Sequence, residues 1–76
     1  MRGELHSPRY EAMRELLVRR RKAARLTQHE VAKRLKKPQS FVAKYELGER
    51  RIDLVEFLDI AKAIGFDPGR FLRAII

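Results

Sequence analysis

The chain has 76 residues, and its 18 Lys and Arg residues outnumber its 10 Asp and Glu residues, which gives a formal net charge of +8. This length predicts one small domain over residues 1–76 and excludes large cofactor folds such as a doubly wound sheet. The absence of Cys excludes disulfides, thiolate zinc sites and Cys nucleophiles. The positive charge predicts a polyanionic partner, either a nucleic acid or an anionic membrane surface.

The sequence has no segment typical of targeting or of membrane insertion. Its first seven residues contain no apolar stretch, and no run approaches the roughly 18 consecutive apolar residues of a spanning helix. We therefore expect a cytoplasmic protein without a membrane as its partner.

Capping and breaking residues predict the first three helices. Ser7-Pro8 is typical of an N-cap followed by the first helical position, and the helix continues to about Ala24. A capping box over residues 27–30 starts a second helix, which Pro38 ends. The third helix begins directly after that proline.

Two further helices complete the predicted fold. Gly48 stops the third helix, and Asp53 with Glu56 forms another capping box before an apolar helix that ends at Gly65. A short last helix occupies about residues 67–75. No segment shows the period-two alternation of a strand, so the fold class is all-α with five helices.

The central feature is a pair of short helices, over residues 28–35 and 39–46, joined by three residues. Such a pair is a helix-turn-helix, whose second helix enters the major groove of DNA. Ala32 fits this geometry because a small side chain lets the two helices approach closely. Together with the charge, the pair indicates a compact DNA-binding domain whose motif spans about residues 27–48.

The motif has a specific order of residue types, which extends downstream to residues 60–65. Its members are Thr27, Gln28, Val31, Ala32, Leu35, Gln39, Ser40, Ala43, Lys44, Tyr45, Glu46 and Gly48. This order resembles the phage Cro/repressor type of helix-turn-helix, also called the xenobiotic-response-element family of bacterial regulators, over about residues 16–72. The resemblance implies five helices around one small core, and dimers that bind palindromic operators.

Four residues of the third helix are candidates for reading bases. The resemblance assigns Gln39 as the first of them, and its amide offers a donor and an acceptor that suit adenine N6 and N7. Ser40 and Lys44 share its exposed face, and the Lys44 side chain is long enough to contact guanine O6 and N7 or a phosphate. Ala43 is small and suits only a thymine methyl.

Four other residues are candidates for binding phosphates. The resemblance implies this role for Gln28, where the amides of the helix N-terminus also favour an anion. Arg50 and Arg51 follow the third helix, the recognition helix that is expected to enter the major groove, so we predict that they contact the DNA backbone. Lys37 lies in the turn before that helix, where phosphate contact and simple solvent exposure are equal alternatives.

Three more side chains are assigned structural roles. The resemblance implies a semi-buried ion pair between Arg21 and Glu46 that bridges the first and third helices. Tyr45 is predicted to lie in the core, with its hydroxyl needing a partner. For Phe41, packing at the edge of the core is favoured slightly over contact with DNA.

Two positions depart from the family pattern. Lys36 stands in the turn where the family often has Gly, and a left-handed conformation there costs a non-Gly residue roughly 1 kcal/mol. Pro38 replaces the usual Ser or Thr, so the recognition helix lacks a side-chain cap.

The end of the chain carries more apolar surface than a short fold needs. We predict that Phe66, Phe71, Leu72, Ile75 and Ile76 are partly covered by a second subunit. The alternative is a last helix that folds entirely onto its own domain.

The sequence shows no nucleophile–base pair, phosphate-binding loop or metal cluster, so we expect neither an enzyme nor a cofactor. We interpret the chain as a homodimeric repressor that occupies an operator. One alternative is the antitoxin of a toxin–antitoxin pair, which binds a toxin protein and represses its own operon. Another is an adaptor that does not bind DNA, against which the polar Gln39, Ser40 and Lys44 argue.

Overall fold

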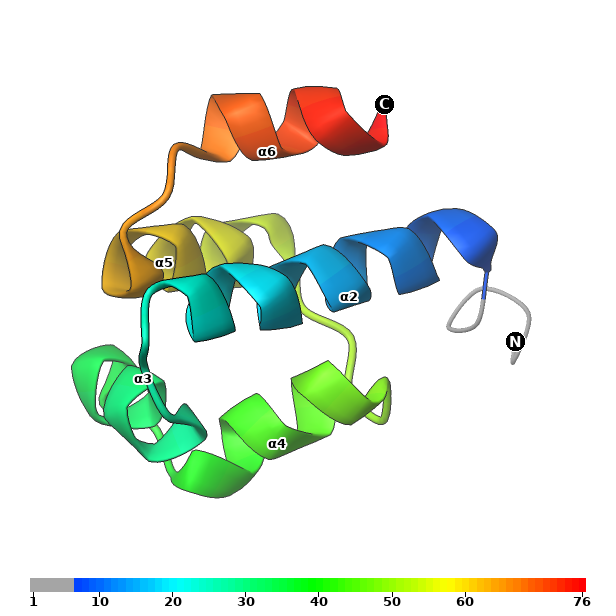
Figure 1. Cartoon of the computed structure of the whole chain (residues 1–76). Coiled ribbons are helices and arrows are strands. Elements are labelled where there is room, and N and C mark those ends of the chain that lie inside the picture. The colour runs from blue at the N-terminus through cyan, green and yellow to red at the C-terminus, as the bar shows by residue number, and fades with distance from the viewer. Residues whose placement is uncertain (1–6) are drawn as a thin grey trace.

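The computed structural model describes residues 7–76, so the first six residues of the predicted domain lie outside it. The described part folds into helices without a strand (Figure 1), which confirms the prediction of an all-α, five-helix fold. The helices are α2 (Pro8–Ala23), α3 (Gln28–Leu35), α4 (Gln39–Leu47), α5 (Leu54–Ile64) and α6 (Pro68–Ile75).

Side-chain caps begin the helices where the sequence predicts them. The Ser7 hydroxyl accepts the amide of Tyr10, at 3.1 Å, to start α2. Complete capping boxes start α3 at Thr27 and α5 at Asp53. Pro38 precedes α4 without a side-chain cap, as the sequence predicts. The helix starts are therefore determined locally, by hydrogen bonds within the first turn.

Lys36 ends α3 in the left-handed conformation, with φ of 58° and ψ of 42°. Its amide and that of Lys37 donate to carbonyls of the last turn of α3, so the ending is well bonded despite the lysine. The turn keeps the geometry that glycine would favour, and the conformational cost falls on this residue. The departure from the family pattern is thus accommodated within the turn, by the left-handed conformation of Lys36.

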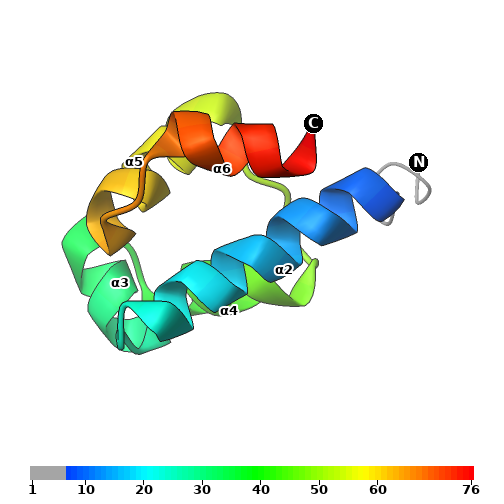
Figure 2. The same cartoon turned by 45° about the horizontal axis from the view of Figure 1, so that its top comes forward.

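The helices place α2 between α4 and α6. In Figures 1 and 2, α4 and α6 lie on opposite sides of the molecule, and α2 contacts both of them. The two helices of the motif, α3 and α4, pack against each other, and α3 also packs against α5. One side of α4 consequently faces away from the rest of the molecule.

The core receives buried side chains from every one of these helices. Phe57 and Phe71 contact each other with ring centroids 5.2 Å apart, and Phe66 stacks on Phe71 at 5.0 Å. The other buried apolar residues are Leu17, Val31, Ala32, Phe41, Val42, Tyr45, Ile60, Ala61, Ala63 and Ile64. Phe41 and Tyr45 meet edge-on, so the core packing predicted for both is confirmed. The partner expected for the Tyr45 hydroxyl is wrong, because this buried oxygen has no hydrogen-bond partner within residues 7–76.

The burial of Phe71 corrects one residue of the predicted dimer interface. Its side chain is 0% exposed, because it is enclosed by Phe57 and Phe66 of its own chain. It therefore has no exposed surface for a partner and packs in the core instead.

Within residues 7–76, no helix is long and apolar enough to cross a membrane.

Candidate nucleic-acid interface

The outward side of α4 carries the four candidate base-reading residues. Gln39, Ser40 and Lys44 are exposed and Ala43 is half-buried. Because residues i and i+4 lie one above the other on a helix, Gln39 with Ala43 and Ser40 with Lys44 run side by side along this side of α4, and we call the four together the row on α4. The opposite face of α4 is buried and consists of Phe41, Val42, Tyr45 and Glu46.

A buried ion pair fixes α4 against α2. Arg21 Nε lies 2.6 Å from Glu46 Oε2, and Arg21 Nη2 lies 3.0 Å from Glu46 Oε1. The remaining Arg21 Nη1 donates to the Leu26 carbonyl at 2.8 Å. Hydrogen bonding to Glu46 raises the pKa of Arg21 above its ordinary value. This bidentate geometry holds the direction of the recognition helix as well as its distance from α2.

The two glutamines of the motif are connected to this ion pair. Gln28 Nε2 donates to Glu46 Oε1 at 2.8 Å, and Gln39 Nε2 donates to Gln28 Oε1 at 2.7 Å. The candidate phosphate ligand of α3 therefore contacts the candidate base reader of α4. The sequence did not predict this contact, since the two residues belong to different helices and meet only when the helices pack.

Arg14 adds a second link between α2 and α4, which the sequence also did not reveal. Its Nη1 donates to the backbone carbonyl of Glu46 near the end of α4. Its Nε and Nη2 both bond Glu11 Oε1, at 2.9 and 2.5 Å. The only sequence signal was the spacing of three between Glu11 and Arg14, which suits a local pair on a helix.

Phe41 carries two of the candidate phosphate ligands on its ring. Lys37 Nζ lies 5.4 Å from the ring centroid, and the Arg50 guanidinium carbon lies 4.7 Å from it. Arg50 also pairs with Glu56 at 3.0 and 2.9 Å, and this pair lowers the pKa of Glu56. Cation–π contact and ion pairing therefore place these charges beside the start and the end of α4.

Arg51 is held by a different aromatic ring. Its guanidinium carbon lies 4.6 Å from the centroid of Tyr10, a residue of α2. The basic residue that follows α4 is thus positioned by the first helix of the described chain. Lys37, Arg50 and Arg51 flank the row on α4 from both sides along the sequence, which suits contact with two stretches of DNA backbone.

Several apolar side chains remain exposed on α5 and α6. These helices run antiparallel, so that the start of α5 and the end of α6 lie at the same end of the pair (Figures 1 and 2). Of the predicted interface residues, Leu72 and Ile76 are exposed, while Phe66 and Ile75 are half-buried. Sequence reasoning missed three exposed residues of α5, namely Leu54, Val55 and Leu58. The signal was present, because α5 has more apolar residues than one core-facing side can hold, although Glu56, Asp59 and Lys62 interrupt its outer side.

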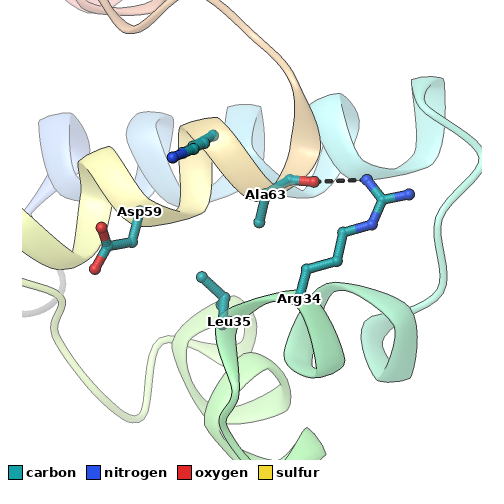
Figure 3. A pocket seen from close by; sticks show the side chains of 5 residues that line it. Arg34, Leu35, Asp59 and Ala63 are labelled. Atoms are coloured by element: carbon teal, nitrogen blue, oxygen red, sulfur yellow. Dashed lines mark hydrogen bonds between the residues drawn. The ribbon is translucent and has the colours of Figure 1, made fainter.

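A shallow pocket lies between α3 and α5, and Arg34, one of its lining residues, has a structural role there (Figure 3). Arg34 extends from α3 to α5 at one side of the pocket and donates from Nη1 to the Ala63 carbonyl at 2.8 Å. This bond satisfies a carbonyl in the last turn of α5, where a cation is also favourable. The other lining residues are Leu35, Asp59 and Lys62. Over residues 7–76, no cluster of His, Asp and Glu side chains is arranged to hold a metal.

Comparisons with known proteins agree with this geometry. A family model for helix-turn-helix proteins matches residues 17–71. The chain is similar to the solved structure of an XRE-family-like protein from Pseudomonas syringae pv. tomato str. DC3000, with a TM-score of 0.90 and 46% sequence identity. That match covers 96% of this chain and 89% of the other. A search of curated proteins finds no match. The chain therefore belongs to the Cro/C1-type (xenobiotic-response-element) family of helix-turn-helix DNA-binding transcription regulators.

Proposed function

We propose that this regulator binds a palindromic operator as a homodimer and represses transcription by occupying it. The observation that carries the proposal is the polar row on the free side of α4, which is flanked by basic residues and backed by a buried ion pair. A rigidly mounted row of this kind suits insertion into the major groove.

In the proposed complex, base reading and backbone contact are divided between different side chains. Gln39 pairs with a base, while Ser40, Ala43 and Lys44 contact neighbouring positions of the half-site. The phosphate contacts come from Gln28 at the start of α3 and from the basic residues Lys37, Arg50 and Arg51. The phosphate contacts supply affinity for DNA of any sequence, and the row on α4 supplies the preference for one operator sequence.

The proposed dimer forms through the apolar face of α5 and α6. An exposed apolar face at one end of a small domain is typical of a protein–protein contact. Its exposed members are Leu54, Val55, Leu58, Leu72 and Ile76. In the proposed two-fold dimer, the two α4 helices lie roughly 34 Å apart, one turn of DNA, so that they enter successive major grooves.

Selection from random double-stranded DNA at moderate salt tests this proposal. We expect an inverted repeat whose half-site centres are separated by about 10 base pairs. Recovery of DNA without an enriched motif would contradict sequence-specific repression. A monomer that binds the product of an adjacent short reading frame would instead favour the antitoxin alternative, with a toxin covering the apolar face.

A further inference from the structure

A continuous chain of hydrogen bonds runs from the buried ion pair to the exposed start of α4. Arg21 donates two hydrogen bonds to the Glu46 carboxylate. Gln28 Nε2 donates to Glu46 Oε1 at 2.8 Å, and Gln39 Nε2 donates to Gln28 Oε1 at 2.7 Å. Glu46 is 5% exposed, whereas Gln39 lies on the surface. The chain therefore links a fixed charge in the interior to the side chain proposed to read a base.

The chemistry of Glu46 determines the orientation of both amides. A carboxylate paired with arginine has no proton to donate, so Gln28 must turn its NH₂ group toward Glu46. The reverse orientation would set two acceptor oxygens against each other at hydrogen-bond distance. The Gln28 oxygen consequently faces Gln39, which must in turn present its own NH₂ group to it.

This orientation leaves Gln39 with a defined set of free polar atoms. One amide proton is used by Gln28, and the second proton and Oε1 remain. One donor and one acceptor match N7 and N6 of adenine, whereas guanine presents two acceptors, N7 and O6. We propose that Glu46 is a specificity-determining positioning residue, which acts through Gln28 to set the hydrogen-bonding pattern that Gln39 offers to DNA. This inference rests on the proposed base reading by Gln39.

Two substitutions separate this role from a purely structural one. Gln28→Met removes the amide and leaves the Arg21–Glu46 pair intact. Glu46→Gln replaces one acceptor oxygen with a donor, so either orientation of Gln28 becomes permissible. His29→Met makes a matched control, since His29 is the exposed neighbour of Gln28 and lies outside the hydrogen-bond chain.

The first measurement is base preference. Matched operators with each base at the position read by Gln39 are competed against one another, at a temperature where circular dichroism shows every variant to be folded. We expect wild type and His29→Met to prefer adenine over guanine by about tenfold or more. Gln28→Met and Glu46→Gln should reduce that preference to about threefold or less, because Gln39 is no longer oriented.

The second measurement uses the free protein. The sequence contains two Gln residues and no Asn, so the ¹⁵N–¹H spectrum has only two side-chain amide groups. We expect the Gln39 amide signals to shift in Gln28→Met and Glu46→Gln and to stay in place in His29→Met. We call this orientation of Gln39 by Glu46 through Gln28 the relay. Unchanged signals and an unchanged preference in Gln28→Met would overturn it.

The remaining outcomes distinguish the relay from the proposed function. If only Glu46→Gln alters base preference, Glu46 acts through the packing of α4 and the relay is wrong. A selective wild type with equally selective variants refutes the relay alone and leaves the proposed function standing. A wild type without preference at any position refutes both, because Gln39 then reads no base.

Discussion

Arg21 and Glu46 form a two-point contact, 2.6 Å from Nε to Oε2 and 3.0 Å from Nη2 to Oε1, that joins α2 to the recognition helix α4. Both side chains are largely buried, at 12% and 5% exposed. A buried charge that loses its partner destabilises a protein strongly, so removal of either side chain should lower the stability of the fold.

We predict that Glu46→Ala lowers the stability of the fold by about 3 kcal/mol, because it leaves the Arg21 guanidinium buried without its carboxylate. For a domain of this size, the melting temperature should fall by roughly 10 to 25 °C in a circular-dichroism scan. Arg20→Ala, at an exposed neighbour of Arg21, should change it little. An unchanged melting temperature in Glu46→Ala would show that the pair contributes nothing.

Gln39→Ala should remove base discrimination at one position of each half-site and leave the fold intact, since Gln39 is exposed. The expected loss is roughly 1–3 kcal/mol of discrimination, measured by competition among operators that differ at single positions. If the preference is preserved across all operator variants, Gln39 is not the base reader and the docking of α4 differs from the proposal.

Arg51→Ala should weaken binding to every sequence by a similar factor, because a phosphate contact carries no sequence information. With two Arg51 residues in a dimer, the plot of log affinity against log salt should flatten by about 2. Lys62→Ala on α5 is the control for the loss of one charge, and its slope should stay near that of wild type. An effect confined to particular sequences would show that Arg51 reads bases.

The Arg50–Glu56 pair predicts a pH dependence of stability. Hydrogen bonding to Arg50 lowers the pKa of Glu56 below its ordinary value of 4.5. A group whose folded pKa is depressed adds stability above its unfolded pKa and loses it as pH falls through the folded value. Glu56→Gln should therefore melt below wild type at pH 7, and the difference should shrink as the pH falls below 4.5 and through the lowered pKa of folded Glu56. Parallel melting curves from pH 7 to 3 would contradict this assignment.

Leu58→Glu should convert the proposed dimer into a monomer, because it sets a charge in the apolar face of α5 and α6. Leu58 is 45% exposed, so its replacement should not damage the core. Light scattering after size exclusion gives the mass directly. Leu47→Glu introduces the same change at an exposed leucine of α4 and should leave the mass unchanged. A Leu58→Glu dimer of undiminished affinity would place the interface elsewhere.

The helices were predictable because their boundaries depend on neighbouring residues. Thr27 with Glu30, and Asp53 with Glu56, each bond within a single turn, and the structure has both capping boxes. The burial of Phe71 was not predictable in this way, since it depends on Phe57 from the preceding helix. The sequence shows that a side chain is apolar, and only the packing of helices shows which apolar side chains remain outside.

In the candidate site, too, features set by one helix were predictable from the sequence, and contacts between helices were not. The exposed row on α4 follows from the helical period, because Gln39 and Ala43 are four residues apart and share a face. The bond between Gln28 and Gln39 depends instead on how α3 and α4 meet. The contact of Arg14 with the Glu46 carbonyl likewise requires the path of α2 across α4.

Phe41, buried in the core at 9% exposed, also affects how the free protein meets DNA. Its ring already restrains Lys37 and Arg50 before any nucleic acid arrives. Freezing a long side chain on binding costs about 0.5–1.5 kcal/mol, and a side chain already confined loses less of that freedom. In the proposed complex, this core residue would thereby reduce the entropy lost when Lys37 and Arg50 bind the DNA backbone.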